Sequence, residues 1–280
     1  MKFTKMQGAG NDYVYVNCFA ERLPEEARPA MAIRVSERHF GIGSDGLICI
    51  CPSEKADFRM DMYNADGSRS GMCGNGIRCV GKYVYDHGLT DKTKLVIETG
   101  AGLRFLTLHT DGGKVSAVTV DMGEPVFTPE KIPVNAQGRD FIRQRVSVDG
   151  RDWEVTALSV GNPHAVIFLR EDVDTLDLPR IGPMFENHAL FPERVNTEFV
   201  NVLPDGRLKM RVWERGSGET MACGTGATAV LAAATLCGHA PGEADVLLRG
   251  GTLHIRWDRE KNRLYMTGPA VTVYDGELFD

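Results

Sequence analysis

Two short segments of this sequence combine a cysteine with the glycines that shape an anion site. The pattern Cys-Gly-x-Gly occurs at residues 73–76 and again at 223–226, and each copy leads into a segment with a helix-like pattern, 77–86 and 227–236. Glycines let the backbone turn tightly and expose N–H groups, which together with the positive end of a helix dipole suit a carboxylate. The same field favours thiolate over thiol. Each segment therefore predicts an activated cysteine beside a docked small acid.

A matched pair of cysteines suits the inversion of a carbon atom next to a carboxylate. Inversion removes a proton from one face and returns a proton to the other, and one acid–base group cannot reach both faces without moving. A thiolate and a thiol can share this task, because the group that is thiolate in one direction must be thiol in the reverse direction. Cys73 and Cys223 are therefore candidates for the two bases of a stereoinversion.

Other interpretations of these cysteines stay open at this point. A single turn of this kind is also typical of a buried structural cysteine. A redox pair is conceivable, although no Cys-x-x-C arrangement occurs among the seven cysteines, and the same absence disfavours zinc. A phosphate-binding loop needs Lys followed by Ser or Thr after the glycines, which neither copy has. The pattern thus implies neither a metal nor a nucleotide.

The chain repeats itself at an offset of about 150 residues, which indicates two similar domains that arose by duplication. Short β-type runs outnumber helical segments in both halves, so each half is expected to be a strand-rich α+β unit. A glycine and prolines place a boundary near residue 120. Besides the cysteine turns, the aligned pairs are 58–64 with 208–214, 99–103 with 249–253, and, at an offset of 151, 10–12 with 161–163.

Composition excludes several classes of protein. The chain has 280 residues, 42% of them hydrophobic and 25% charged, which is typical of a globular protein rather than a disordered, collagen-like or coiled-coil one. The net charge of −6 and the lack of a basic run disfavour nucleic acid as a partner. The N-terminus has no apolar segment of signal-peptide length, and no stretch of the chain approaches the roughly 18 apolar residues of a membrane span. We therefore expect a cytoplasmic protein with reduced thiols and no membrane partner.

The ordered set of motifs resembles the diaminopimelate epimerases, which invert one α-carbon of LL-2,6-diaminopimelate to give the meso isomer without a cofactor. The reaction serves the biosynthesis of lysine and of peptidoglycan precursors. Apart from the two cysteine turns, the motifs are 5–12 (KMQGAGND), 38–46 (RHFGIGSDG), 63–68 (YNADGS), 161–164 (GNPH), 194–199 (RVNTEF) and 213–220 (WERGSGET).

The resemblance implies a role for each matching residue. Cys73 and Cys223 would be the two catalytic bases, and residues matching His164 and Glu214 are thought to tune them. Some members have a glutamine substrate contact where this chain has Gly46. From the sequence alone, the asparagines beside glycine could equally be turn residues. The residues implied to bind substrate are Asn11, Asn64, Gly74, Asn75, Asn162, Asn196, Glu214, Arg215, Gly224 and Thr225.

The implied fold is of the α+β class, with two similar pseudo-symmetric domains. Each would be a strand-rich sheet or barrel wrapped round a central helix, with the active site in the cleft between the domains. Residues 1–120 plus 264–280 would form the N-terminal domain with Cys73, and residues 121–263 the C-terminal domain with Cys223. Members of the family are commonly homodimers, so we expect the diaminopimelate substrate and a second copy of the chain as partners.

Two competing functions remain. A racemase or isomerase of the same fold acts on another substrate, such as proline, hydroxyproline or a small tricarboxylate, but such relatives generally lack this set of asparagines with Glu214 and Arg215. A redox-sensing binding protein would close a disulfide between Cys73 and Cys223 and hold an amino acid without converting it. Exchange of the substrate α-proton separates the enzymes from the binder.

Overall fold

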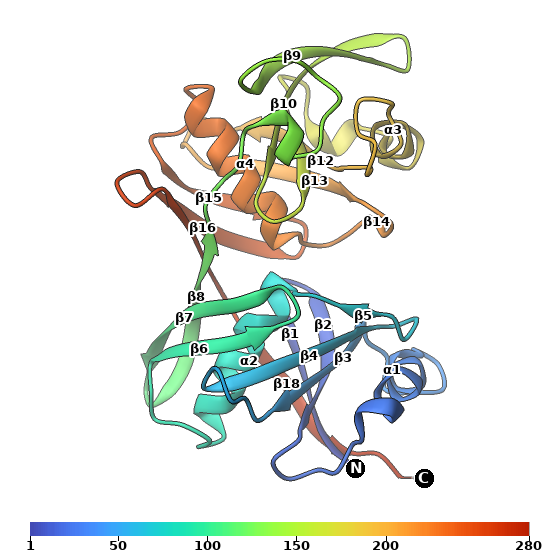
Figure 1. The fold of residues 1–280 in the computed structure, drawn as a ribbon, viewed down its shortest axis with the longest axis vertical. Coiled ribbons are helices and arrows are strands. Elements are labelled where there is room, and N and C mark those ends of the chain that lie inside the picture. Colours follow the sequence, from blue (N-terminus) through green and yellow to red (C-terminus); the bar gives the residue numbers. More distant parts are fainter. Residues whose placement is uncertain (280) are drawn as a thin grey trace. The chain divides into compact units, whose positions relative to one another are not determined.

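The chain folds into two compact units in the computed structural model, which describes residues 1–279. The first unit comprises Met1–Val120 and the segment from Thr267 onward, and the second comprises Asp121–Met266. Strands β8 (Lys114–Gly123) and β17 (Arg263–Gly268) contain the two points at which the chain passes from one unit to the other (Figure 1).

In the first unit, a curved sheet surrounds helix α2 (Gly74–Asp86), as Figure 1 shows. The helix packs on β1, β2 and β7 through buried side chains that include Ile77, Val80 and Val84. The short helix α1 (Arg28–Ser36) covers β2, β3 and β4 from outside. The strands are β1 (Lys2–Gly8), β2 (Asn11–Asn17), β3 (Gly46–Cys51), β4 (Phe58–Asn64), β5 (Arg69–Ser70), β6 (Lys94–Thr99), β7 (Gly102–Asp111), β8 and β18 (Val271–Glu277).

In the second unit, a curved sheet likewise surrounds helix α4 (Gly224–Leu236) (Figure 1). This helix is made almost entirely of Ala, Val, Leu and Thr, and it is buried on most faces because it packs on β10–β13, β15 and β16. Helix α3 (Leu178–Glu186) packs on β9 and β12–β14. The strands are β9 (Phe141–Val148), β10 (Arg151–Ser159), β11 (Pro163–Phe168), β12 (Asn196–Val202), β13 (Leu208–Glu214), β14 (Gly218–Glu219), β15 (Glu243–Leu248), β16 (Gly251–Asp258) and β17.

The strand ladders of the two units match one another. In the first, β2 is parallel to β3, β3 antiparallel to β4, β4 parallel to β6, and β6 antiparallel to β7. In the second, β11, β12, β13, β15 and β16 repeat this series in the same order. The predicted α+β class with two similar strand-rich units is therefore confirmed. The chain's last strand, β18, pairs antiparallel with β1.

The central helices begin three residues earlier than their apolar patterns predict. Helix α2 starts at Gly74 rather than at residue 77, and α4 at Gly224 rather than at 227. The reason is that a cysteine occupies each N-cap position and its sulfur accepts a hydrogen bond from a backbone N–H of the first turn. The glycine turns are thus part of the helices. No helix described in residues 1–279 is long and apolar enough to cross a membrane.

Candidate active site

The first cysteine turn joins the start of α2 to the start of β2. Cys73 Sγ accepts a hydrogen bond from Gly76 N (3.3 Å), and its thiol donates to Asn11 Oδ1 (3.2 Å). The amide of Asn11 is held from its other end, where Nδ2 donates to Asp45 Oδ2 (2.6 Å). Asp45 therefore fixes which end of the Asn11 amide faces the sulfur. Cys73 and Asn11, which were predicted separately as site residues, are thus in direct contact.

A charged cluster lies behind Asn11. Lys5 Nζ is 2.5 Å from Asp12 Oδ2, and Arg38 donates to both Asp12 Oδ1 (3.2 Å) and Asp45 Oδ1 (3.0 Å). Burial acts to raise the pKa of Asp12, but the two cations outweigh it and leave that pKa below its usual value. The cluster anchors the loop that carries Asn11.

A buried arginine holds the first turn of α2. Arg78 is fully buried, and its Nη1 donates to Gly74 O (3.1 Å) and to Asn75 Oδ1 (3.0 Å), while Nε donates to Pro269 O (3.1 Å). Burial lowers the pKa of this guanidinium. Asn75 itself is only 2% exposed, so its side chain is part of the packing of the turn. Sequence reasoning did not single out Arg78.

Asn64 lies at the end of β4, where it shapes the following turn. Its Nδ2 donates to Ser68 Oγ (2.9 Å), and its backbone N donates to Ser68 O (2.9 Å). The nearby Gly46, at the start of β3, has no room for a side chain. A Cβ there would lie 2.1 Å from the carbonyl oxygen of Tyr63. This backbone therefore excludes the glutamine that some family members carry at the position.

The cysteine of the second turn is more deeply buried than that of the first. Cys223 is 4% exposed, and its Sγ accepts from Gly226 N (3.3 Å) and lies 3.4 Å from Thr225 Oγ1. Burial raises the pKa of Cys223 well above its usual value, and the carboxylates of Glu214 and Glu198 raise it further. The prediction of an activated thiolate is therefore wrong for Cys223, because burial and two carboxylates outweigh the helix dipole.

Glu214, at the end of β13, stands beside the Cys223 thiol. Its Oε1 accepts a short hydrogen bond from the Thr220 hydroxyl. Burial is the main cause that raises the pKa of Glu214, and the charge of Glu198 adds to it. Two carboxyl groups thus lie close to one thiol. This arrangement can hold a proton near Cys223.

Asn162, just before β11, and His164, within it, continue this site. Asn162 Nδ2 lies 3.5 Å from Thr225 Oγ1, and Asn162 Oδ1 is 2.9 Å from His164 Nε2. On its other side, His164 Nδ1 is 2.6 Å from Glu198 Oε1, and both of these side chains are fully buried. The structure thus connects four predicted residues to Cys223 within the second unit. Glu198, which links His164 to the cysteine turn, was not predicted.

Asn196 and Arg215 form a separate part of the second unit. Asn196 Nδ2 donates to Pro163 O (2.9 Å), and its Oδ1 accepts from Arg215 N (2.9 Å). The Arg215 guanidinium donates to Glu193 O (2.9 Å) and is partly exposed. Asn196 is therefore a brace between two chain segments, and Arg215 is a cation with donors left for a ligand.

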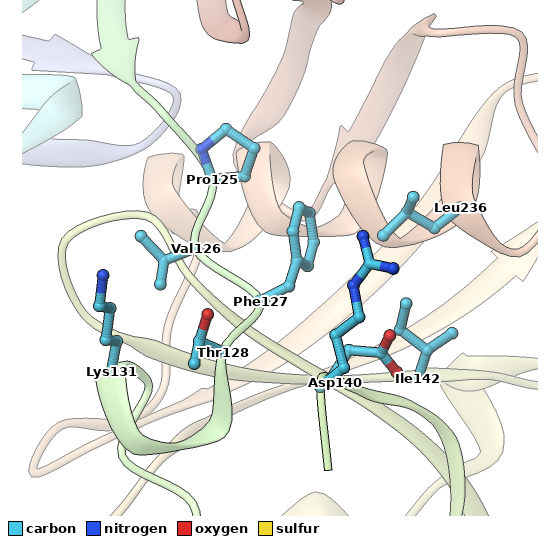
Figure 2. Close-up of a pocket in the computed structure, with 9 residues that line it drawn as sticks. Pro125, Val126, Phe127, Thr128, Lys131, Asp140, Ile142 and Leu236 are labelled. Carbon is cyan, nitrogen blue, oxygen red and sulfur yellow. The ribbon is translucent and has the colours of Figure 1, made fainter.

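Two cavities of the second unit are lined by other residues than these. One of 460 Å³ is lined by Phe127, Arg139 and Leu236 among others (Figure 2), and one of 670 Å³ by Phe168 and His239 among others. Leu236 is the last residue of α4, so the first cavity is about 20 Å along the helix from Cys223. Within residues 1–279, no cluster of three or more His, Cys, Asp or Glu side chains is arranged to hold a metal ion.

Comparison with known proteins agrees with the motifs. The sequence profile described as "Diaminopimelate epimerase" matches residues 3–128 and 156–273. A protein of that name from Desulfovibrio desulfuricans is 55% identical over 285 aligned residues, covering 100% of this chain and 98% of the relative. Another, from Agathobacter rectalis, is 56% identical and covers 99% of both chains. The chain belongs to the diaminopimelate epimerase family.

Solved structures that resemble this member of the diaminopimelate epimerase family extend the comparison to more distant proteins. A phenazine biosynthesis protein of the PhzF family from Bacillus anthracis superposes with a TM-score of 0.71 at 19% identity, covering 100% of this chain and 99% of the other. A probable proline racemase from Agrobacterium radiobacter gives 0.72 at 14% identity, covering 99% and 92%. At such low identity these likenesses establish the fold and leave the substrate to the closer relatives.

Proposed function

We propose that this protein is an isomerase that converts LL-2,6-diaminopimelate to the meso isomer by proton transfer at the α-carbon between two cysteines, without a cofactor. The observation that carries the proposal is the duplicated cysteine cap, since Cys73 and Cys223 occupy the N-cap of equivalent helices and each sulfur accepts from its own helix N–H. The relatives that bear the epimerase name are more than half identical over nearly the whole chain.

The reacting carboxylate would dock on the first turns of the helices. Gly74 with Asn75, and Gly224 with Thr225, would donate backbone N–H groups to its oxygens. As the α-proton leaves, negative charge moves onto that carboxylate, and fixed N–H donors stabilise it. In the direction that starts from the LL isomer, the cysteine on one face takes the proton as thiolate. The other returns a proton as thiol, and the raised pKa of Cys223 suits it to that part.

The remaining polar residues would recognise the rest of the substrate. Arg215 has guanidinium donors suited to the distal carboxylate. Asn11 and Asn162 would bind near the reacting carbon from the two cysteine turns, because each is hydrogen bonded within its turn. His164 and Glu214 would act on Cys223 by holding its proton. Asn64 and Asn196 complete the proposed set as residues that shape the turns carrying the others.

We further propose that the protein works as a homodimer in the cytoplasm and serves lysine and peptidoglycan-precursor biosynthesis. Strand β18 exposes Val271, Val273 and Tyr274, which form an apolar face that a second copy would cover. Light scattering of the purified protein tests the dimer, since a monomer has a mass of 30.8 kDa. A monomer at micromolar concentration would contradict this proposal.

The test of function compares four single substitutions under reducing conditions. Cys73→Ser and Cys223→Ser should lower conversion of LL-diaminopimelate by about 10²-fold or more, because each removes one acid–base group. Cys18→Ser and Cys237→Ser are matched controls, since these cysteines are half-buried in the same two units but neither lies at the N-terminus of a helix. Near-normal turnover in either of the first two variants would defeat the two-base mechanism. Activity on proline instead of diaminopimelate would move the assignment to the racemases.

A further inference from the structure

The two cysteine turns pack on chemically different neighbours. A Cβ added to Gly76 would lie 2.7 Å from Ile48 Cδ1, and a Cβ added to Gly226 would lie 2.7 Å from Glu198 Oε1. The Cys73 turn thus rests on a methyl group and the Cys223 turn on a carboxyl group. The same added Cβ would lie 3.2 Å from Cys223 Sγ, so Glu198 belongs to the immediate surroundings of that sulfur.

Ile48 and Glu198 are equivalent positions of the duplicated fold. Ile48 is the third residue of β3, which runs parallel to β2, and Glu198 is the third residue of β12, which runs parallel to β11. Their ladder partners are also equivalent: Tyr15 and Met62 for Ile48, Val166 and Val212 for Glu198. By the same alignment, Tyr13 stands in the first unit where His164 stands in the second. A unit of this fold therefore forms with a tyrosine and an isoleucine at these places. The buried pair of His164 and Glu198 is not a requirement of the fold.

The hydrogen bonds determine how many protons this pair holds. Asn162 directs its Nδ2 at Thr225 Oγ1, so its Oδ1 is the atom that meets His164 Nε2, and Nε2 must donate. The contact between His164 Nδ1 and Glu198 Oε1 then holds one proton. The pair has no net charge. Its carboxylate end is the end that contacts Gly226, and hence the end that faces Cys223.

The pair is also costly to bury. Glu198 Oε2 has no hydrogen-bond partner among the described residues and is out of reach of solvent. A buried polar atom without a partner costs about 1–3 kcal/mol. Since the equivalent place in the first unit is filled by isoleucine at no such cost, the carboxyl group is retained for something other than stability.

We propose that Glu198 is a positioning residue for Cys223: through His164 it fixes the amide of Asn162, and its carboxylate keeps the Cys223 proton in place until substrate binds. This inference rests on the proposed function, because it concerns the protonation of the two proposed bases. It makes Cys223 differ from Cys73 in how firmly its proton is held before the reaction starts. The ionisable groups that face the Cys223 turn are His164 on β11, Glu198 on β12 and Glu214 on β13.

The test measures the pH dependence of alkylation at Cys223, which needs no turnover. Wild type and Glu198→Gln are treated with iodoacetamide across a pH series, and each cysteine peptide is followed by mass spectrometry. Glutamine keeps the shape but removes the negative end of the pair. Alkylation of Cys223 at pH 8 should become about threefold or more faster, with the profile moved to lower pH. Glu171→Gln is the matched control, since it removes an exposed carboxylate of the same unit.

Two outcomes would overturn the proposal. One is a Cys223 profile in Glu198→Gln that superposes on that of wild type. The second uses a further variant, Glu198→Ile, and the half-buried Cys237 of the same unit. If alkylation of Cys237 rises together with that of Cys223 in both Glu198→Gln and Glu198→Ile, the unit has loosened and the role of Glu198 is structural. An inactive wild-type protein would defeat the proposed function but would leave this alkylation result intact, so the two failures are distinguishable.

Discussion

Replacing Gly226 by alanine tests how tightly the Cys223 turn is built. The added Cβ would lie 2.7 Å from Glu198 Oε1 and 3.2 Å from Cys223 Sγ. Ordinary contacts begin near 3.4 Å, so the carboxylate must move by about 0.7 Å. The Glu198 carboxylate cannot rotate away freely, because its Oε1 is hydrogen bonded to the fully buried His164. The strain is therefore shared with the sulfur.

The expected magnitudes separate stability from activity. Alanine is up to about 1 kcal/mol better than glycine in a helix, and overpacking costs about 1–3 kcal/mol, so Gly226→Ala should lose only about 0–2 kcal/mol of unfolding free energy. A displacement approaching 1 Å at a catalytic group lowers the rate by up to about 10²-fold. Epimerisation should therefore fall about 10- to 100-fold while the protein remains folded.

The assay compares Gly226→Ala with its counterpart Gly76→Ala. In the first unit the added Cβ meets the flexible end of Ile48 at 2.7 Å, and the closest Cys73 atom that it meets is Cβ, at 3.5 Å. Gly76→Ala should therefore retain more activity than Gly226→Ala. Conversion of LL-diaminopimelate is followed by chromatography and stability by urea denaturation. Wild-type turnover in Gly226→Ala, or a larger loss in Gly76→Ala, would refute the reasoning.

Three further predictions concern stability. Asp61 is 3% exposed and pairs with the buried Arg28, so Asp61→Asn should cost about 3–5 kcal/mol in urea denaturation, and a loss below about 1 kcal/mol would contradict the pairing. The pKa of Cys223 is raised on folding, so its contribution to stability is full below about pH 8.5 and is lost as the pH rises further. The melting temperature should thus fall from about pH 8 to about pH 10, and less so in Cys223→Ala; equal slopes would contradict this. Gly46→Gln should cost about 3 kcal/mol or more, because its Cβ would collide with the Tyr63 carbonyl; an unchanged melting temperature would show that the strand can shift.

Local pattern was enough to predict the framework of each unit. The cysteine turns, the helices that follow them and the runs 58–64 and 208–214 lie where glycine, apolar spacing and alternation indicate. The offset of 150 residues predicted the duplication, because ladder partners repeat with it. The helix starts differ, since a sulfur cap is not part of the usual set of N-cap signals. The return to the first unit also differs, because it lies at Thr267 rather than at residue 264.

The electrostatics of the site could not be read from the sequence. Glu198 lies in a short strand whose sequence gives no sign of a buried charge. Charged side chains are almost never fully buried without a partner, so its burial could be predicted only if the partner were known. Its partner is His164, 34 residues earlier, so neither residue indicates the other. The protonation of Cys223 depends on this pair and on Glu214. A prediction from the helix N-terminus alone therefore gave the wrong direction for the pKa shift of Cys223.

In the proposed mechanism, two cysteines exchange the α-proton with water on opposite faces of one carbon. The most direct measurement incubates the fully reduced protein with LL-diaminopimelate in deuterium oxide, without added cofactor, and follows stereochemistry and mass together. We expect the meso isomer with deuterium at the inverted carbon. LL substrate recovered early should remain unlabelled, because thiol and thiolate act on different faces. Neither inversion nor exchange, or inversion that retains the original proton, would contradict it.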